Sequence, residues 1–228
     1  MLKRNLVGLF IGAILVLSLS LSACLDNKKR ESDDLFLDYQ INAREGDENL
    51  SVLLMFRDPS TGDAFELKPP SEARLDNELL KPDSTFKKNY YYELYKSIDS
   101  FSGKHAIIFT DINKKSFKQE FEFQRFYLTT PIPDTISRDS LTVEFTGVLP
   151  DDHISLIITD TAFSNNDINR TFPQGVKKII LDSGDLDNLS TGPVQLEFVR
   201  ETRFPIRSTR IKGLFELNYN LKREVYLK

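Results

Sequence analysis

The segment IKGLFELNYNLKREVYL, residues 211–227, alternates apolar and polar side chains along most of its length. In an extended chain this period of two places the apolar side chains on one face, as in a half-buried β-strand. Shorter segments with the same alternation follow from residue 35 onward, many of them separated by gaps of about ten residues that contain Gly, Pro, Asn and Asp. Such spacing predicts antiparallel sheets rather than β-α-β units. The segments are LFLDYQI (35–41), LSVLLMF (50–56), FKQEFEFQRF (117–126), SLTVEFTG (140–147), HISLIIT (153–159), VKKIIL (176–181) and PVQLEFV (193–199).

The clearest interruption of this pattern is TTPIPD, residues 129–134. Its two prolines cannot donate to a strand ladder and hold the chain extended, which is typical of a stiff linker. About 95 residues lie on either side, the size of one immunoglobulin-like sandwich. We therefore predict an all-β chain with two tandem immunoglobulin-like antiparallel β-sandwich domains, residues 35–130 and 131–228.

A weak internal repeat supports this division. SIDSFSGKHAIIF (97–109) aligns with DLDNLSTGPVQLEF (185–198) when one residue is inserted. In both segments the spacing predicts one helical turn, then a glycine, then a strand. Duplication and chance similarity of two β-domains both explain the match, and both predict the same architecture for the two halves.

The N-terminus reads as a secretory signal. Lys3 and Arg4 precede residues 6–23, LVGLFIGAILVLSLSLSA, which carry no charge. Eighteen residues is the lower limit for a membrane-spanning helix, whereas a basic start, an apolar stretch and small residues at its end are typical of a cleaved signal peptide. An uncleaved signal anchor is the alternative.

The signal ends in Leu21-Ser22-Ala23-Cys24, which resembles the lipobox of bacterial lipoproteins. The resemblance implies a signal peptide over residues 1–23, cleavage between Ala23 and Cys24, and acylation of Cys24 on its sulfur and its new amino group. Cys24 is the only cysteine, so disulfides and thiolate metal sites are excluded in the mature chain. Two or three acyl chains anchor a protein stably to a membrane.

Residues 24–34 form the predicted tether between the lipid and the folded chain, because LDNKKRESDD is polar and lacks apolar periodicity. Leu25 differs from the aspartate that retains enterobacterial lipoproteins in the inner membrane. This resemblance implies an envelope protein on the outer membrane. Ser32-Asp33-Asp34 is similar to the export tags of surface lipoproteins in Bacteroidota, but it lies farther from the cysteine, so the periplasmic and the surface face both stay open.

Charge and composition restrict the function classes. The formal net charge is −4, and removal of Lys3 and Arg4 with the signal lowers it by two, to −6. Without a basic stripe the chain is a poor nucleic-acid binder. Its two histidines, His105 and His153, lie in different predicted domains, and no motif joins them to a catalytic or metal-binding set. We expect no enzyme activity, no cofactor and no metal.

The segment DSGDLDN, residues 182–188, gathers oxygen ligands of the type that calcium prefers. It lacks the spacing, the central glycine and the distal glutamate of an EF-hand loop. The simpler interpretation is that Asp182 or Ser183 caps the short helical turn that follows.

Two clusters are candidate contact surfaces. Arg203, Arg207 and Arg210 form a basic patch in an acidic chain, which suits an acidic partner, although a solvated hairpin end is the plainer interpretation. Tyr90 and Tyr92 lie on one face of a predicted strand and are candidate glycan contacts. The absence of tryptophan weighs against a carbohydrate platform.

The leading hypothesis is a lipid-anchored cell-envelope lipoprotein that acts as a non-enzymatic binding or assembly module for an envelope protein or a glycan. It resembles two-domain β-sandwich envelope lipoproteins of Bacteroidota. The same resemblance leaves two alternatives open. One is a glycan-binding accessory lipoprotein of a polysaccharide-uptake system. The other is a fimbrial-type subunit that polymerises by strand exchange, for which Leu35–Ile41 is the candidate released strand.

Overall fold

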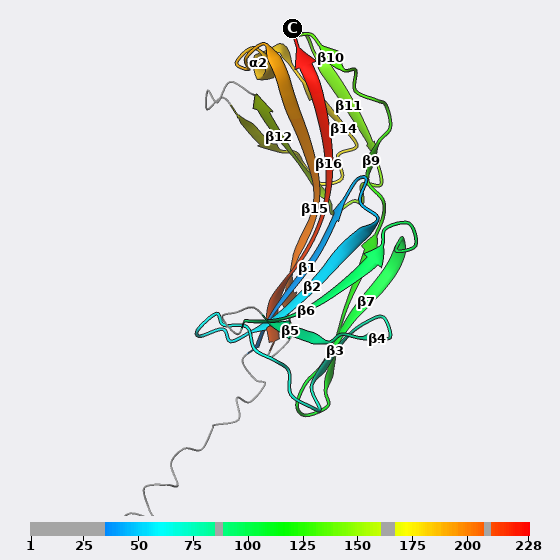
Figure 1. Cartoon of the computed structure of the whole chain (residues 1–228), viewed down its shortest axis with the longest axis vertical. Helices are drawn as coiled ribbons and strands as arrows, with labels where there is room; N and C mark the ends of the chain where they lie inside the picture. The colour runs from blue at the N-terminus through cyan, green and yellow to red at the C-terminus, as the bar shows by residue number, and fades with distance from the viewer. Residues whose placement is uncertain (1–34, 85–88, 161–166, 208–210) are drawn as a thin grey trace, which may run out of the picture. The chain divides into compact units, whose positions relative to one another are not determined.

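The structure, a computed structural model, describes residues 35–84, 89–160, 167–207 and 211–228. Strands dominate these residues, so the prediction of an all-β chain is confirmed (Figure 1). The predicted turn near residue 186 is the short helix α2 (Ser183–Leu186). The strands are β1 (Leu35–Arg44), β2 (Asn49–Arg57), β3 (Glu72–Leu75), β4 (Glu78–Leu79), β5 (Pro82–Ser84), β6 (Tyr90–Ser97), β7 (Gly103–Thr110), β8 (Ser116–Phe123), β9 (Tyr127–Leu128), β10 (Thr135–Ile136), β11 (Leu141–Thr146), β12 (His153–Asp160), β13 (Ile168–Thr171), β14 (Lys178–Leu181), β15 (Gly192–Arg207) and β16 (Ile211–Leu227).

The strands form three sheets that build two sandwiches in tandem. A nine-stranded sheet has the order β13-β12-β15-β16-β1-β2-β6-β5, with β10 also paired to β16. In the N-terminal sandwich its β1-β2-β6-β5 side packs on the sheet β4-β3-β7-β8, and the rings of Phe56 and Phe109 meet at 5.1 Å. In the C-terminal sandwich its β12-β15 side packs on β14-β11-β9, and the rings of Phe145 and Phe198 meet at 5.3 Å. The predicted tandem sandwich fold is therefore confirmed.

Strands β15 and β16 belong to both sandwiches (Figure 1). They pair in one antiparallel register from Gly192↔Leu227 to Arg207↔Lys212. The part of β15 that pairs with β12 ends at Glu201, and the part of β16 that pairs with β1 ends at Asn220. The hairpin therefore changes partners near the opposed residues Arg200 and Tyr219. We call this crossing point the junction.

Two pairings of β16 depart from the expected antiparallel arrangement. Strand β1 runs parallel to β16 over the register Leu35↔Ile211 to Arg44↔Asn220, and β10 runs parallel to its last residues. Residue alternation is the same in parallel and antiparallel strands, so the sequence pattern does not distinguish them. The predicted boundary between residues 130 and 131 stays a prediction. The structure also shows that the C-terminal hairpin, β15 and β16, supplies strands to the sheet of the N-terminal sandwich.

The core is continuous along β16, because its alternate side chains from Ile211 to Leu221 are buried. Phe215 illustrates the packing, with its ring 4.6 Å from that of Phe204 and 5.1 Å from that of Phe121. Burying one such side chain contributes about 1.5–3 kcal/mol. Gly213 lets β1 approach closely, since a Cβ there would lie 2.3 Å from the carbonyl oxygen of Leu37.

Candidate functional site

The junction is held together by a buried arginine. Arg200, in β15, has no exposed side-chain surface, and its Nη1 donates to the carbonyl oxygens of Gln124 at 2.8 Å and Gly147 at 2.5 Å. One oxygen belongs to the segment between β8 and β9, and the other to the segment between β11 and β12. Arg200 therefore ties two connections to the shared hairpin. Its guanidinium also lies 5.8 Å from the Phe126 ring centre and 5.7 Å from that of Tyr219, within cation–π range.

The charge of Arg200 is balanced inside the protein. Its Nε lies 3.6 Å from Oδ2 of Asp152, whose side chain is equally buried. The backbone N–H of Leu149 and the hydroxyl of Thr202 donate to the Asp152 carboxylate. Burial lowers the pKa of Arg200, and the negative charge of Asp152 opposes this shift. Within the described residues, Nε and Nη2 of Arg200 have no hydrogen-bond partner. The nearby carboxylate of Asp152 therefore provides the opposite charge that this buried guanidinium needs.

Gly147 permits the close contact between the two connections. Its φ of +83° lies in the region that favours glycine, and a Cβ there would lie 1.8 Å from the carbonyl oxygen of Arg125. The β11–β12 connection therefore packs directly against the backbone that follows β8.

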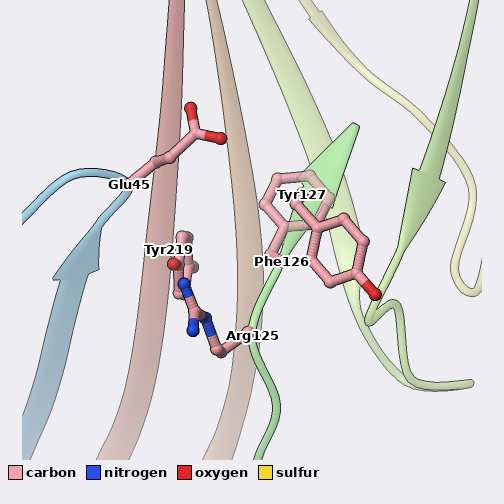
Figure 2. A pocket seen from close by; sticks show the side chains of 5 residues that line it. All are labelled: Glu45, Arg125, Phe126, Tyr127 and Tyr219. Carbon is pink, nitrogen blue, oxygen red and sulfur yellow. The ribbon is translucent and has the colours of Figure 1, made fainter. Parts of the chain in front are cut away.

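A hollow of about 400 Å³ opens beside the junction and is lined by Glu45, Arg125, Phe126, Tyr127 and Tyr219 (Figure 2). Three segments that are distant in the sequence supply these side chains: the residue that follows β1, the segment from Arg125 to the first residue of β9, and the middle of β16. Phe126 and Tyr219 are buried, whereas 47% of Tyr127 is exposed. The hollow thus has an apolar base, and Tyr127 supplies the accessible aromatic ring of its lining.

The polar groups of the hollow are engaged in ion pairs. Both oxygens of Glu45 pair with the guanidinium of Arg223, with Nη2 and Oε1 3.0 Å apart. Nη1 of Arg125 lies 2.7 Å from Oδ1 of Asp99. Burial raises the pKa of Tyr219, although the arginine opposes this shift, so the hydroxyl stays protonated near neutral pH.

The predicted basic patch is only partly brought together. Arg203 and Arg207 are exposed on the same side of β15, and Arg210 lies outside the described residues. The charge of Arg203 is balanced by Glu216, with Nε and Oε1 3.0 Å apart. The patch is separate from the hollow, and its contact with a partner stays a prediction. Ala23 and Cys24 also lie outside the described residues.

The expectation for the tyrosine run is corrected at Tyr92, which points into the core and is 2% exposed. Its hydroxyl accepts a hydrogen bond from the backbone N–H of Leu67 at 2.7 Å, and burial raises its pKa to about 12. Tyr90 is half-buried at the start of β6. A period of two shows which residues share a face but does not show which face is inside. The more exposed ring of this strand is Tyr95, at 61%.

The remaining candidates have structural partners. Nδ1 of His105 lies 3.0 Å from Oδ2 of Asp76, whereas Nδ1 of His153 lies 3.3 Å from the carbonyl oxygen of Phe172. Asp182 caps α2 and forms a capping box with Asp185, which confirms the predicted cap. Across the part of the chain that the structure describes, no group of three or more His, Cys, Asp or Glu side chains is arranged to hold a metal ion.

Sequence reasoning missed the hollow but contained one signal for the junction. In VQLEFVR, residues 194–200, the alternation that buries Val194, Leu196 and Phe198 also places Arg200 on the inner face. A charged residue at an inward position is rarely buried without a partner. This position was therefore a detectable site of internal charge.

No protein-family model and no curated protein matches the chain. Among solved structures, it is similar to a chain in the crystal structure of Dpr11 IG1 bound to DIP-gamma IG+IG2, with 7% identity, coverage of 82% of this chain and 98% of that chain, and a TM-score of 0.26. It is similar to the tandem Ig repeats of Dlar, with 11% identity, coverage of 86% and 97%, and a TM-score of 0.25. It is also similar to SGBP-B of the Bacteroides ovatus mixed-linkage glucan utilization locus in complex with a mixed-linkage heptasaccharide, with 13% identity, coverage of 79% and 43%, and a TM-score of 0.23. Similarity at this level does not bear on what this chain binds.

Among the described residues, no helix has both the length and the apolar composition needed to cross a membrane.

Proposed function

We propose that this chain is a lipid-anchored cell-envelope protein that acts as a non-enzymatic binding module and holds its ligand in the hollow beside the junction. The observation that carries this proposal is the lining of the hollow, which combines the half-exposed Tyr127 and the polar side chains of Arg125 and Glu45 with the buried rings of Phe126 and Tyr219. Small-ligand sites commonly have about this size, 300–1,000 Å³, with a mainly apolar lining and a few polar groups that orient the ligand.

The junction supports this role because its contacts restrain the backbone beside the hollow. Arg200 ties the backbone of Gln124, next to the lining residues Arg125, Phe126 and Tyr127, to the shared hairpin. A site whose side chains are ordered before binding loses less conformational entropy when the ligand arrives.

The chemistry of the lining favours binding over catalysis. General acid–base catalysis needs a group that titrates near the working pH, and nucleophilic catalysis needs an activated nucleophile. Glu45 and Arg125 are instead held in ion pairs with Arg223 and Asp99. The five lining residues include neither histidine nor cysteine.

The proposed anchor is supported by the lipobox resemblance at Cys24. We expect the wild-type protein to fractionate with the outer membrane and to carry acyl chains on the N-terminal cysteine of the mature chain. Cys24→Ala should leave an unprocessed precursor without the lipid mass. Intact mass spectrometry of the detergent phase checks this, and an unlipidated wild-type protein would contradict the anchor.

The binding role is tested by site-specific photocrosslinking in intact cells. A benzophenone side chain at position 127 should give a crosslinked species, because this ring belongs to the hollow. The same group at position 226 is the matched control, since Tyr226 is 48% exposed and Tyr127 is 47% exposed. Equal crosslinking at both positions, or none at position 127, would contradict a ligand in the hollow.

The fimbrial-type subunit is the second candidate, and the position of β1 favours it. This strand lies between β16 and β2, so its removal would open a groove for a donor strand. With residues 35–41, four inward side chains would leave that groove: Leu35, Leu37, Tyr39 and Ile41. A protease-dependent ladder of self-crosslinks in cells would support this candidate, and a monomer after removal of residues 35–41 would exclude it.

A further inference from the structure

We infer that the ligand of the hollow is a neutral carbohydrate, which stacks a sugar ring on Tyr127 and exchanges hydrogen bonds with Arg125 and Glu45. This inference rests on the proposed function and adds the ligand class. It follows from the charge balance of the hollow, the hydrogen-bonding capacity of its polar groups, and the exposure of its ring.

The charged groups of the hollow cancel in pairs. Glu45 is matched by Arg223, and Arg125 is matched by Asp99. A ligand with net charge would find no uncompensated opposite charge here and would have to break an existing pair to gain one. Because desolvating a charge is costly without a new partner, this arrangement disfavours ionic ligands and favours neutral ones.

The same groups keep hydrogen-bonding capacity after their internal contacts. A guanidinium has about five N–H donors and a carboxylate accepts at about four positions. Arg125 contacts Asp99, and Glu45 receives two N–H groups from Arg223. Arg125 therefore still donates and Glu45 still accepts. A ligand with several hydroxyl groups, each of which can both donate and accept, satisfies such side chains without adding charge.

The aromatic part of the site suits a flat, weakly polar ligand surface. Tyr127 is about half exposed, and the buried rings of Phe126 and Tyr219 lie at the base of the hollow. Aromatic faces pack on apolar groups, and the phenolic hydroxyl stays in contact with water. A sugar ring offers a face of C–H groups bordered by hydroxyls, which combines this apolar contact with the polar contacts above.

The test is affinity electrophoresis of the mature chain in gels that contain dextran, a neutral β-glucan or a galactomannan, with dextran sulfate as the charged counterpart of dextran. We expect at least one neutral polysaccharide to retard the wild-type protein. Tyr127→Ala should weaken this binding about tenfold or more, a loss of about 1.4 kcal/mol. The equally exposed Tyr226→Ala should bind like the wild type. No retardation by any neutral polysaccharide, or an equal loss in both variants, would overturn the ligand class.

A second variant tests the charge argument separately. Glu45→Gln removes one carboxylate and leaves Arg223 unbalanced, so it should increase retardation by dextran sulfate several-fold. Glu197→Gln makes the same change in net charge at the Lys222 pair, whose atoms lie 3.4 Å apart outside the hollow, and should not have this effect. An equal gain in both variants would show that dextran sulfate responds only to net charge and would overturn the argument.

The crosslinked species at position 127 distinguishes failure of the proposed ligand class from failure of the proposed binding role. Hexose-series mass losses from that species support a carbohydrate ligand. A crosslinked peptide or lipid would overturn the ligand class while leaving the binding module intact. If no species forms specifically at position 127, both the binding module and its ligand class fail.

Discussion

The two sandwiches differ in where their strands come from. The C-terminal sandwich is built almost entirely from consecutive strands, β9 to β16. The N-terminal sandwich combines β1 to β8 with parts of β15 and β16 that lie more than 90 residues beyond β6 in the sequence. One half is therefore close to self-sufficient, whereas the other depends on the last hairpin of the chain. Non-local pairing of this kind also delays folding, because the distant strands must meet first.

The largest effect should come from cutting the chain between the halves. Residues 24–130 contain β1 without the ten residues of β16 that pair with it, so we expect this fragment to lack a cooperative unfolding transition. Residues 127–228 should keep native-like structure in the C-terminal sandwich, with the ends of β15 and β16 exposed. Urea unfolding followed by circular dichroism checks both. A cooperative transition in the first fragment would show that the dependence is wrong.

The next effect concerns the arginine that joins the halves. Arg200→Met leaves Asp152 buried without its cationic partner, and breaking a buried ion pair costs about 3–5 kcal/mol. Adding Asp152→Asn should then cost less than the same change costs in the wild-type protein. A double-mutant cycle of unfolding free energies measures this coupling, and additive effects would argue against the ion pair.

The next prediction compares a glycine of the junction, Gly147, with a glycine in an ordinary turn, Gly62. Gly147→Ala adds a clash with the carbonyl of Arg125 to the strain of a positive φ, and we expect a loss of about 2–4 kcal/mol. Gly62 has a similar φ of +78° with nothing within 4 Å of its Cβ position, so Gly62→Ala should lose only about 1 kcal/mol from strain. Equal losses in unfolding free energy would mean that the contact at Gly147 relaxes easily.

The smallest effect is a difference in alkaline sensitivity. Burial raises the pKa of Tyr39 and Tyr92 in the N-terminal sandwich, the latter to about 12, above the ordinary value of 10. The unfolded state loses these protons first, so their stabilisation is complete below pH 10 and declines as the pH rises toward 12. Tyr92 alone should lose about 1 kcal/mol between pH 9 and 11.

The variant Tyr92→Phe isolates this contribution. It removes the acceptor for the N–H of Leu67 and should be about 1 kcal/mol less stable at pH 8. Its stability should then decline less steeply above pH 10 than that of the wild-type protein. Urea unfolding at pH 8, 9, 10 and 11 measures both slopes, and parallel curves would contradict the assignment.

Residue alternation was sufficient to predict most strands and the tandem sandwich fold. It works because a half-buried strand must place apolar side chains at every second position. The cap of α2 was also predictable, since Asp182 interacts with backbone only three residues away. In the tyrosine run, by contrast, the alternation was visible but its inward face was not, because Tyr92 is buried through its pairing with Leu54 of β2.

By itself the sequence determined local properties: which residues extend as strands, which residue caps the helix, and that the chain is acidic with one cysteine. Only the tertiary structure decided that β1 runs parallel to β16, that the last hairpin serves both sandwiches, and that Glu45, Arg125, Tyr127 and Tyr219 line one hollow. The physical reason is the sequence separation of the residues that determine each feature. Alternation and capping depend on neighbours in the chain, whereas the β1–β16 pairing and the hollow depend on contacts between segments 80 or more residues apart.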